Sequence, residues 1–168
     1  AIKNNYEKEI QIIDQFADKS KDALDIGVYR GVYSYKLSNY FKKIHAFEPN
    51  PLLYPYLHKN LKKIIKNINL YNVGLSDKNG EVSLKLPTRS KSLFKNNIEE
   101  LFRLGAASIH PNKTFKSFKS IPVKIKKLDD FNFENKIKFV KIDVEGHEIE
   151  VINGAKETKK KDKPIMLI

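Results

Sequence analysis

The fold is decided by the stretch Asp22-Ala23-Leu24-Asp25-Ile26-Gly27-Val28-Tyr29-Arg30-Gly31-Val32-Tyr33-Ser34-Tyr35. Its apolar run predicts a strand over 22–26, and the apolar spacing that follows predicts a helix over 32–41 with a tight loop between the two. Gly27 can take a positive φ where the chain leaves the strand, and Gly31 has no Cβ that would keep the helix start away from a ligand. Because a helix N-terminus offers unpaired N–H groups, the loop suits a ligand that carries a carboxylate or a phosphate.

The spacing of this loop argues against a dinucleotide. A dinucleotide fingerprint has three glycines, and Tyr29 stands here at the position of the second one. Asp25 in front of the loop suits an ammonium group, which a pyrophosphate lacks and which S-adenosylmethionine carries beside its carboxylate. An ordinary strand-to-helix turn, with glycines that serve only the backbone, explains the loop equally well.

A second acid favours the ligand-binding interpretation. Residues 43–47 predict another strand, and Glu48 follows it 23 residues after Asp25, which is where an acid that accepts both ribose hydroxyls is expected. The alternative is a plain turn into a helix over 51–66, with Asn50 as its cap and Pro51 at its first position. Both interpretations can hold together.

Composition sets broad limits. A length of 168 residues predicts one domain, and the absence of cysteine excludes disulfides and thiolate metal sites. No signal peptide or apolar span is visible, so we expect a cytoplasmic location. The net charge of +12 would attract nucleic acid, but only three of the 32 basic residues are arginine. Because specific phosphate and base contacts favour arginine, a solvated lysine surface is the preferred interpretation.

The remaining patterns complete an alternation of strands and helices. We expect a helix over 5–18, strands over 68–75 and 137–142, a helix from Ile149, a polar run over 156–163 and a last strand from Pro164. Alternating strands and helices predict a parallel, doubly wound α/β sheet, and right-handed crossovers give the strand order 3-2-1-4-5. The ends of the first and fourth strands should then meet at one site.

The middle of the chain has a different pattern. Period-two alternation predicts strands over 81–86 and 121–128 that pair antiparallel at a sheet edge, with a hairpin turn over 77–80. The stretch 87–120 between them is little patterned apart from a short helix over 98–104, and we interpret it as a lid over the substrate side. His110 within it is a candidate for substrate contact, although a bland loop explains it better.

Four motifs in this order resemble the FkbM family of S-adenosylmethionine-dependent methyltransferases: Asp25-Ile26-Gly27-x-x-x-Gly31-x-Tyr33-Ser34, Phe47-Glu48-Pro49-Asn50-Pro51, Leu128-Asp129-Asp130 and Lys141-Ile142-Asp143-Val144-Glu145-Gly146-His147-Glu148. The resemblance implies a class I methyltransferase fold, a Rossmann-like α/β/α sandwich, as a single domain over 1–168. It also implies O-methylation of a sugar, a glycan or another small hydroxylated substrate.

The resemblance assigns site residues by motif position. Asp25, Gly27 and Gly31 would hold the methionine portion of S-adenosylmethionine, Glu48 the ribose, and Ser76 and Asp77 the adenine side. The same motifs add further residues to the expected cofactor site: Tyr33, Ser34, Pro49, Asn50 and Asp143. Two features differ from the family. Val28-Tyr29 replaces its usual Ala-Asn, and the chain ends after the fifth strand, so we expect a truncated or minimal member.

Three residues are candidates for the catalytic base of an in-line methyl transfer. Asp143, Glu145 and His147 follow the fourth strand, and His147 is favoured because it titrates nearest neutral pH. Asp143 could instead hold the amino group of the donor, and either acid could cap the next helix. We predict no metal, because the two acids lack an identifiable third ligand. The alternatives are a nucleic-acid methyltransferase, for which an Asn/Asp-Pro-Pro-Tyr-like motif is missing, and a non-catalytic S-adenosylmethionine-binding domain.

Overall fold

A five-stranded parallel sheet forms the centre of the protein in a computed structural model that describes residues 8–87, 107–110 and 116–168. Its strand order is β3-β2-β1-β7-β8, and every neighbouring pair is parallel. The strands are β1 (Asp22–Ile26), β2 (Ile44–Phe47), β3 (Ile68–Tyr71), β7 (Ile137–Ile142) and β8 (Ile165–Leu167). This order confirms the predicted doubly wound sheet, with its reversal between β1 and β7.

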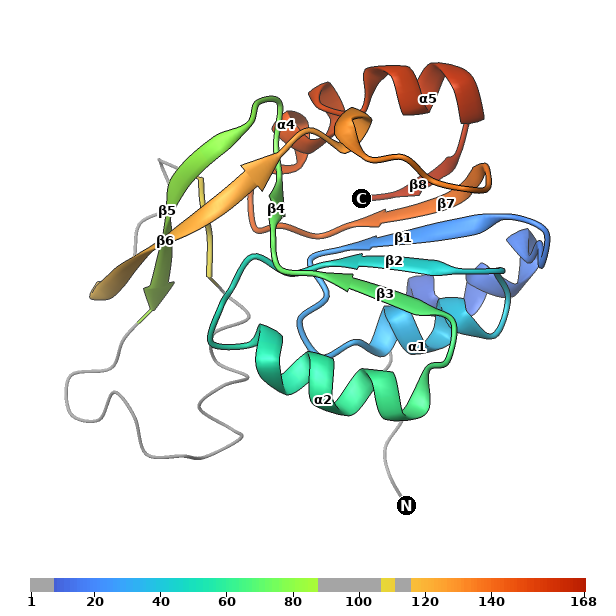
Figure 1. Ribbon diagram of the computed structural model, residues 1–168, viewed down its shortest axis with the longest axis horizontal. Helices are drawn as coiled ribbons and strands as arrows, with labels where there is room; N and C mark the ends of the chain where they lie inside the picture. Colours follow the sequence, from blue (N-terminus) through green and yellow to red (C-terminus); the bar gives the residue numbers. More distant parts are fainter. Residues whose placement is uncertain (1–7, 88–106, 111–115) are drawn as a thin grey trace.

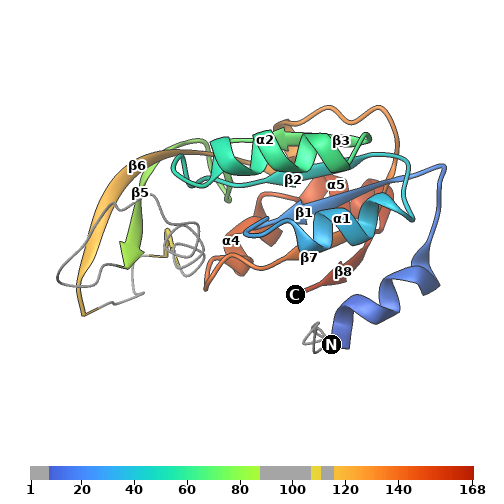
Figure 2. The same ribbon diagram turned by 90° about the horizontal axis from the view of Figure 1, so that it is seen from below.

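Helices cover both faces of the sheet, which confirms the predicted three layers (Figures 1 and 2). On one face lie the 3₁₀ helix η1 (Lys8–Phe16), α1 (Val32–Ser38) and α2 (Tyr54–Ile64). On the other lie the 3₁₀ helix η3 (Leu128–Asp130), α4 (Glu148–Asn153) and α5 (Lys156–Asp162). The largest fully buried side chains include Phe41 and Phe139 on the first face and Phe47 on the second. Burial of such apolar area is what holds the layers together.

The predicted strand over 68–75 is two strands that belong to different sheets. β3 ends at Tyr71, and β4 (Gly74–Leu75) joins β5 (Gly80–Pro87) and β6 (Phe118–Lys126) in a small sheet of order β4-β6-β5. The break follows from Asn72, whose side-chain N–H group donates to the carbonyls of Glu48 (2.8 Å) and Pro49 (3.2 Å). These bonds replace the backbone ladder where β3 would otherwise continue along β2.

The antiparallel pairing of the two middle strands is confirmed, with Ser83 opposite Pro122. Their predicted position at an edge of the main sheet is wrong, because they form the small sheet, which lies beyond the carboxyl ends of the parallel strands (Figure 1). The predicted hairpin turn over 77–80 is also wrong. It joins β4 to β5, which both pair with β6 and not with each other.

Helix bounds differ from the sequence prediction at several places. The helix predicted over 5–18 is 3₁₀ where it is described, and α2 begins at Tyr54 because the Asn50 side chain first accepts the Leu52 N–H in a turn (3.0 Å). The polar run over 156–163 is α5. Asp129 explains this helix, since its carboxylate accepts the N–H groups of Glu157 and Thr158 at 2.9 Å each.

Two sequence predictions fall wholly or mostly on residues that the structure does not describe. The helix predicted over 98–104 and most of the lid over 87–120 lie outside the described residues. Among the residues that are described, no helix is both long enough and apolar enough to cross a membrane.

Candidate active site

The ends of β1 and β7 meet at the predicted site. The Asp143 N–H donates to the Ile26 carbonyl at 3.0 Å. Gly27 has φ +84, and a Cβ built on it would lie 1.9 Å from the Asp143 carbonyl oxygen. The backbone of the glycine loop therefore touches the backbone of the second motif, and only glycine permits both the conformation and the contact.

Gly31 packs against a neighbouring helix. It takes φ +76 as the N-cap of α1, and a Cβ there would lie 2.5 Å from a methyl group of Leu61 in α2. Leu61 thus fills the space that we expected a ligand to approach. Contact between Gly31 and a cofactor stays a prediction, and only the backbone atoms of Gly31 could make it.

Asp25 is fully buried beneath the loop. One carboxylate oxygen accepts the Ser34 hydroxyl at 2.5 Å, and the other lies 3.6 Å from the Lys141 ammonium. Burial raises the pKa of Asp25, and Lys141 and the Ser34 hydroxyl oppose that rise. Tyr33, on the same helix as Ser34, has its ring 5.0 Å from the Lys141 ammonium. Asp25 is therefore out of reach of a ligand, and its contacts are with Ser34 and Lys141.

Glu48 connects the end of β2 to the glycine loop. Its two carboxylate oxygens accept the N–H groups of Tyr29 (3.2 Å) and Asn50 (3.0 Å). Tyr29 reaches this position with a positive φ of 51. Only 7% of Glu48 is exposed, and burial raises the pKa of its carboxyl to about 7 against the effect of these two hydrogen bonds. Asn50 is also buried, and Pro49 between them is half-buried.

Ser76 and His147 join β4 to the start of α4. The Ser76 hydroxyl lies 3.0 Å from His147 Nε2 and 3.2 Å from a carboxylate oxygen of the exposed Asp77. His147 Nδ1 lies 3.4 Å from the Glu150 carboxylate, and only 8% of the residue is exposed. Burial lowers the pKa of the His147 imidazole, although Glu150 opposes this. The lowered pKa favours the neutral imidazole, whose Nε2 is held by Ser76 while Nδ1 has no hydrogen-bond partner among the described residues.

The sequence model of the Methyltransferase FkbM domain matches residues 25–168, which is most of the chain. This chain belongs to the FkbM methyltransferase family. The crystal structure of methyltransferase FkbM from Methylobacillus flagellatus KT has a similar fold, with a TM-score of 0.54 and 16% sequence identity. The match covers 88% of this chain and 32% of the other, so this chain spans about a third of that protein. No curated protein matches this chain.

In this FkbM-family chain the loop after β7 is held by a residue that the sequence analysis gave no role. The Glu148 carboxylate accepts the N–H groups of Gly146 (3.0 Å) and Val144 (3.3 Å). Partial burial acts to raise the pKa of Glu148, but these hydrogen bonds outweigh it and hold the pKa below its usual value. The signal was an acid in the first turn of the next helix. Glu145, at φ 55, lies in the loop that Glu148 organises.

The described part of the 87–120 insert touches the same loop. The Ser108 hydroxyl donates to the Glu145 carbonyl at 2.8 Å and accepts the His110 N–H at 3.0 Å. The backbone of Ser108 is paired with Lys85 of β5, which anchors the segment to the small sheet. A Cβ built on Gly146 would lie 3.8 Å from the His110 ring. His110 is thus adjacent to the second motif, as substrate contact would require.

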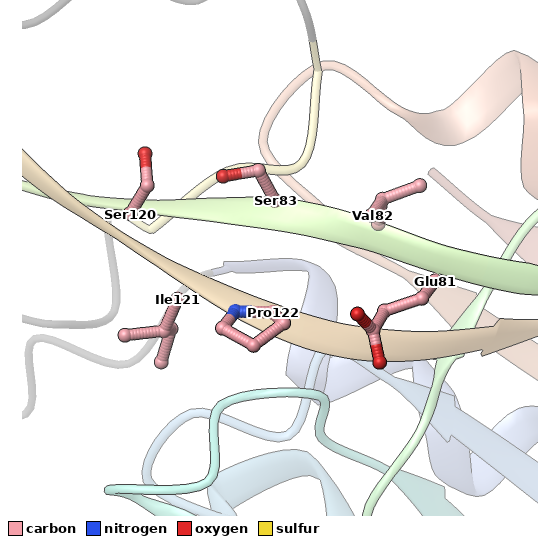
Figure 3. A pocket seen from close by; sticks show the side chains of 6 residues that line it. All are labelled: Glu81, Val82, Ser83, Ser120, Ile121 and Pro122. Carbon is pink, nitrogen blue, oxygen red and sulfur yellow. The ribbon is translucent and has the colours of Figure 1, made fainter.

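A shallow depression of about 310 Å³ lies on the small sheet (Figure 3). It is lined by β5 and β6 residues: Glu81, Val82, Ser83, Ser120, Ile121 and Pro122. None of the predicted site residues lines it. It therefore does not coincide with the place where β1, β2 and β7 end.

The residues at these strand ends fit the donor that the family implies. A carboxylate can accept about four hydrogen bonds, and Glu48 uses two in the contacts described above, which leaves capacity for two ribose hydroxyls. The Asp143 side chain is 60% exposed and can meet an ammonium group. Among the described residues, no three histidine or acidic side chains gather as a metal site would require.

Proposed function

We propose that this chain transfers a methyl group from S-adenosylmethionine to a hydroxyl oxygen of a sugar, a glycan or another small hydroxylated substrate, as one methyltransferase domain. The observation that carries the proposal is the junction of three strand ends. Gly27 contacts Asp143 across β1 and β7, while the Glu48 carboxylate at the end of β2 accepts an N–H group from the same loop. Ligands of doubly wound sheets bind at such a reversal of strand order.

The donor site uses residues from each of these strand ends. Glu48 accepts the ribose hydroxyls, and Asp143 receives the amino group of the methionine portion. Gly27 permits the backbone contact with Asp143 that brings the strand ends together, and Ser76 and Asp77 would lie on the adenine side. When bound, S-adenosylmethionine supplies a methyl group on a positively charged sulfur. The task of the protein is to bring that sulfur and the acceptor oxygen into line, because positioning accounts for much of the rate of such a displacement.

The acceptor side is formed by the loop after β7 and by the insert that touches it. His147 is the proposed base, because its neutral imidazole can accept the hydroxyl proton, with Asp143 and Glu145 as the neighbouring acids. To do so it would have to exchange its Ser76 contact for one with the acceptor. His110 lies beside Gly146 and is a further candidate for contact with the acceptor.

Calorimetry with S-adenosylhomocysteine tests the donor site directly. We expect saturable binding in the micromolar range, with a loss of affinity when Asp143 is replaced by asparagine. If calorimetry detects no binding at millimolar concentration, the proposal is wrong. Retained binding with no methyl transfer to any hydroxylated acceptor would favour the non-catalytic binding domain.

Replacement of His147 by alanine should lower turnover about 100-fold or more, the usual loss for a missing general base. The affinity for S-adenosylhomocysteine should change little, because His147 lies on the acceptor side. His58→Ala is the matched control, since His58 is exposed on α2. Turnover that His147→Ala leaves unchanged would remove His147 from the chemistry and leave it a link between α4 and Ser76.

A further inference from the structure

Lys141 is a buried cation at the junction of the two motifs. Its side chain is only 6% exposed, and its ammonium donates to the Gly27 carbonyl at 2.8 Å. The same ammonium lies 3.6 Å from Asp25 and 3.5 Å from Asp143. Lysine is almost never this buried unless it is paired. Here it is paired with the glycine loop, the end of β1 and the end of β7 at once.

The surroundings of Lys141 explain why its position is so well defined. The face of the Tyr33 ring, from α1, lies 5.0 Å away and attracts the cation. Ser34 from the same helix donates to the Asp25 carboxylate, which in turn faces the ammonium. Contacts from α1, β1, the glycine loop and the end of β7 therefore fix one ammonium group.

Stability alone is a poor reason for this arrangement. Taking an ammonium and a carboxylate out of water costs energy that their attraction often only repays, and apolar residues of similar size can replace such a pair without loss. Asp143 differs from Asp25 in that 60% of its side chain is exposed. Lys141 thus connects a buried acid to one that a ligand can reach.

We propose that Lys141 is a positioning residue for the methyl donor, because it holds the Asp143 carboxylate in the place where Asp143 receives the donor's ammonium group. This inference rests on the proposed function. Lys141 acts through Asp143, which it restrains from β7, while Asp25 and the Gly27 carbonyl keep Lys141 itself in place. Through Asp143, the amino-acid end of the donor depends on Lys141 more than the ribose and adenine do.

Two probes separate that end from the rest of the ligand. S-adenosylhomocysteine has the amino-acid end, and 5′-methylthioadenosine lacks it but keeps the ribose and adenine. Calorimetry on Lys141→Met should show affinity for S-adenosylhomocysteine reduced about 10-fold or more, the scale of one charge-assisted hydrogen bond. Affinity for 5′-methylthioadenosine should stay within about twofold of the wild type. Lys138→Met, on the same strand, is the matched control and should change neither.

Asp143→Asn gives an independent test, because this side chain is 60% exposed and Lys141 keeps its contacts with Asp25 and the Gly27 carbonyl. It should lower the affinity for S-adenosylhomocysteine and leave the affinity for 5′-methylthioadenosine unchanged. Adding Lys141→Met to this variant should lower the affinity for S-adenosylhomocysteine little further. The inference would be overturned if Lys141→Met lowered the affinities for both probes equally, or lowered neither. Wild-type affinities in Asp143→Asn would overturn it as well. A wild type that binds neither probe would sink the proposed function, and the inference with it.

Discussion

Replacement of Gly27 by alanine is expected to destabilise the protein by about 2–6 kcal/mol, enough to leave much of it unfolded. A side chain at φ +84 costs about 1–3 kcal/mol of backbone strain. A Cβ placed 1.9 Å from the Asp143 carbonyl oxygen forces the ends of β1 and β7 apart, at a further cost of about 1–3 kcal/mol. Urea unfolding followed by circular dichroism measures the sum.

Gly146→Ala is the matched control for this experiment. Gly146 has a similar φ of +95, but the atoms nearest to its Cβ position lie at ordinary contact distances of 3.8 Å and 3.9 Å. It should therefore show the backbone strain without the collision. If the two variants lose equal stability, the contact between Gly27 and Asp143 is not what holds the two motifs together.

The fold was predictable because its main signals are local. Apolar runs, the glycine loop and right-handed crossovers determine a parallel sheet and its order, and the structure follows them. Two of the differences arose where a single side chain bonds to a distant part of the chain. Asn72 ends β3 by donating to the carbonyls of Glu48 and Pro49, and Asp129 caps α5 from 28 residues away. Neither contact leaves a periodic trace in the sequence.

The candidate site was predictable in its location but not in its internal contacts. The strand order, which the sequence implies, brings Asp25 and Asp143 together at the carboxyl ends of β1 and β7. The partner between them was missed because Lys141 follows an apolar run in a lysine-rich chain, where a lysine is normally solvated. A charged residue just before a predicted catalytic acid, inside a strand that should be buried, was the available signal.

Glu48→Gln is expected to weaken S-adenosylhomocysteine roughly 10- to 100-fold at about pH 8, because an amide cannot accept two ribose hydroxyls as a carboxylate can. The loss should shrink as the pH falls. The pKa of Glu48 is about 7 in the folded protein, so the wild type itself becomes protonated below that pH. Calorimetry at several pH values should show wild-type affinity rising through about pH 7 and the affinity of the variant staying flat.

Stability should change in the opposite direction. The folded pKa of Glu48 lies above its usual value of 4.5, so the folded state binds the proton more tightly than the unfolded state. Its contribution to stability is therefore full below pH 4.5 and is lost as the pH rises to about 7, by up to roughly 3 kcal/mol. Glu48→Gln removes this loss, so its stability relative to the wild type should improve between about pH 5 and about pH 8 in urea unfolding.

Glu81→Gln controls for the chemical change itself, because Glu81 is exposed on β5 and should alter neither binding nor stability. Glu48→Gln should lower the affinity and raise the relative stability, and these opposite effects distinguish a ligand-binding carboxylate from a purely structural one. A carboxylate kept only for the turn into α2 would show a stability effect with no change in affinity. A loss of affinity in Glu48→Gln that is the same at every pH would mean that the charge of Glu48 does not contribute to holding the ligand. Both effects together would mean that the buried Glu48 carboxylate lowers stability above neutral pH and at the same time binds the ribose.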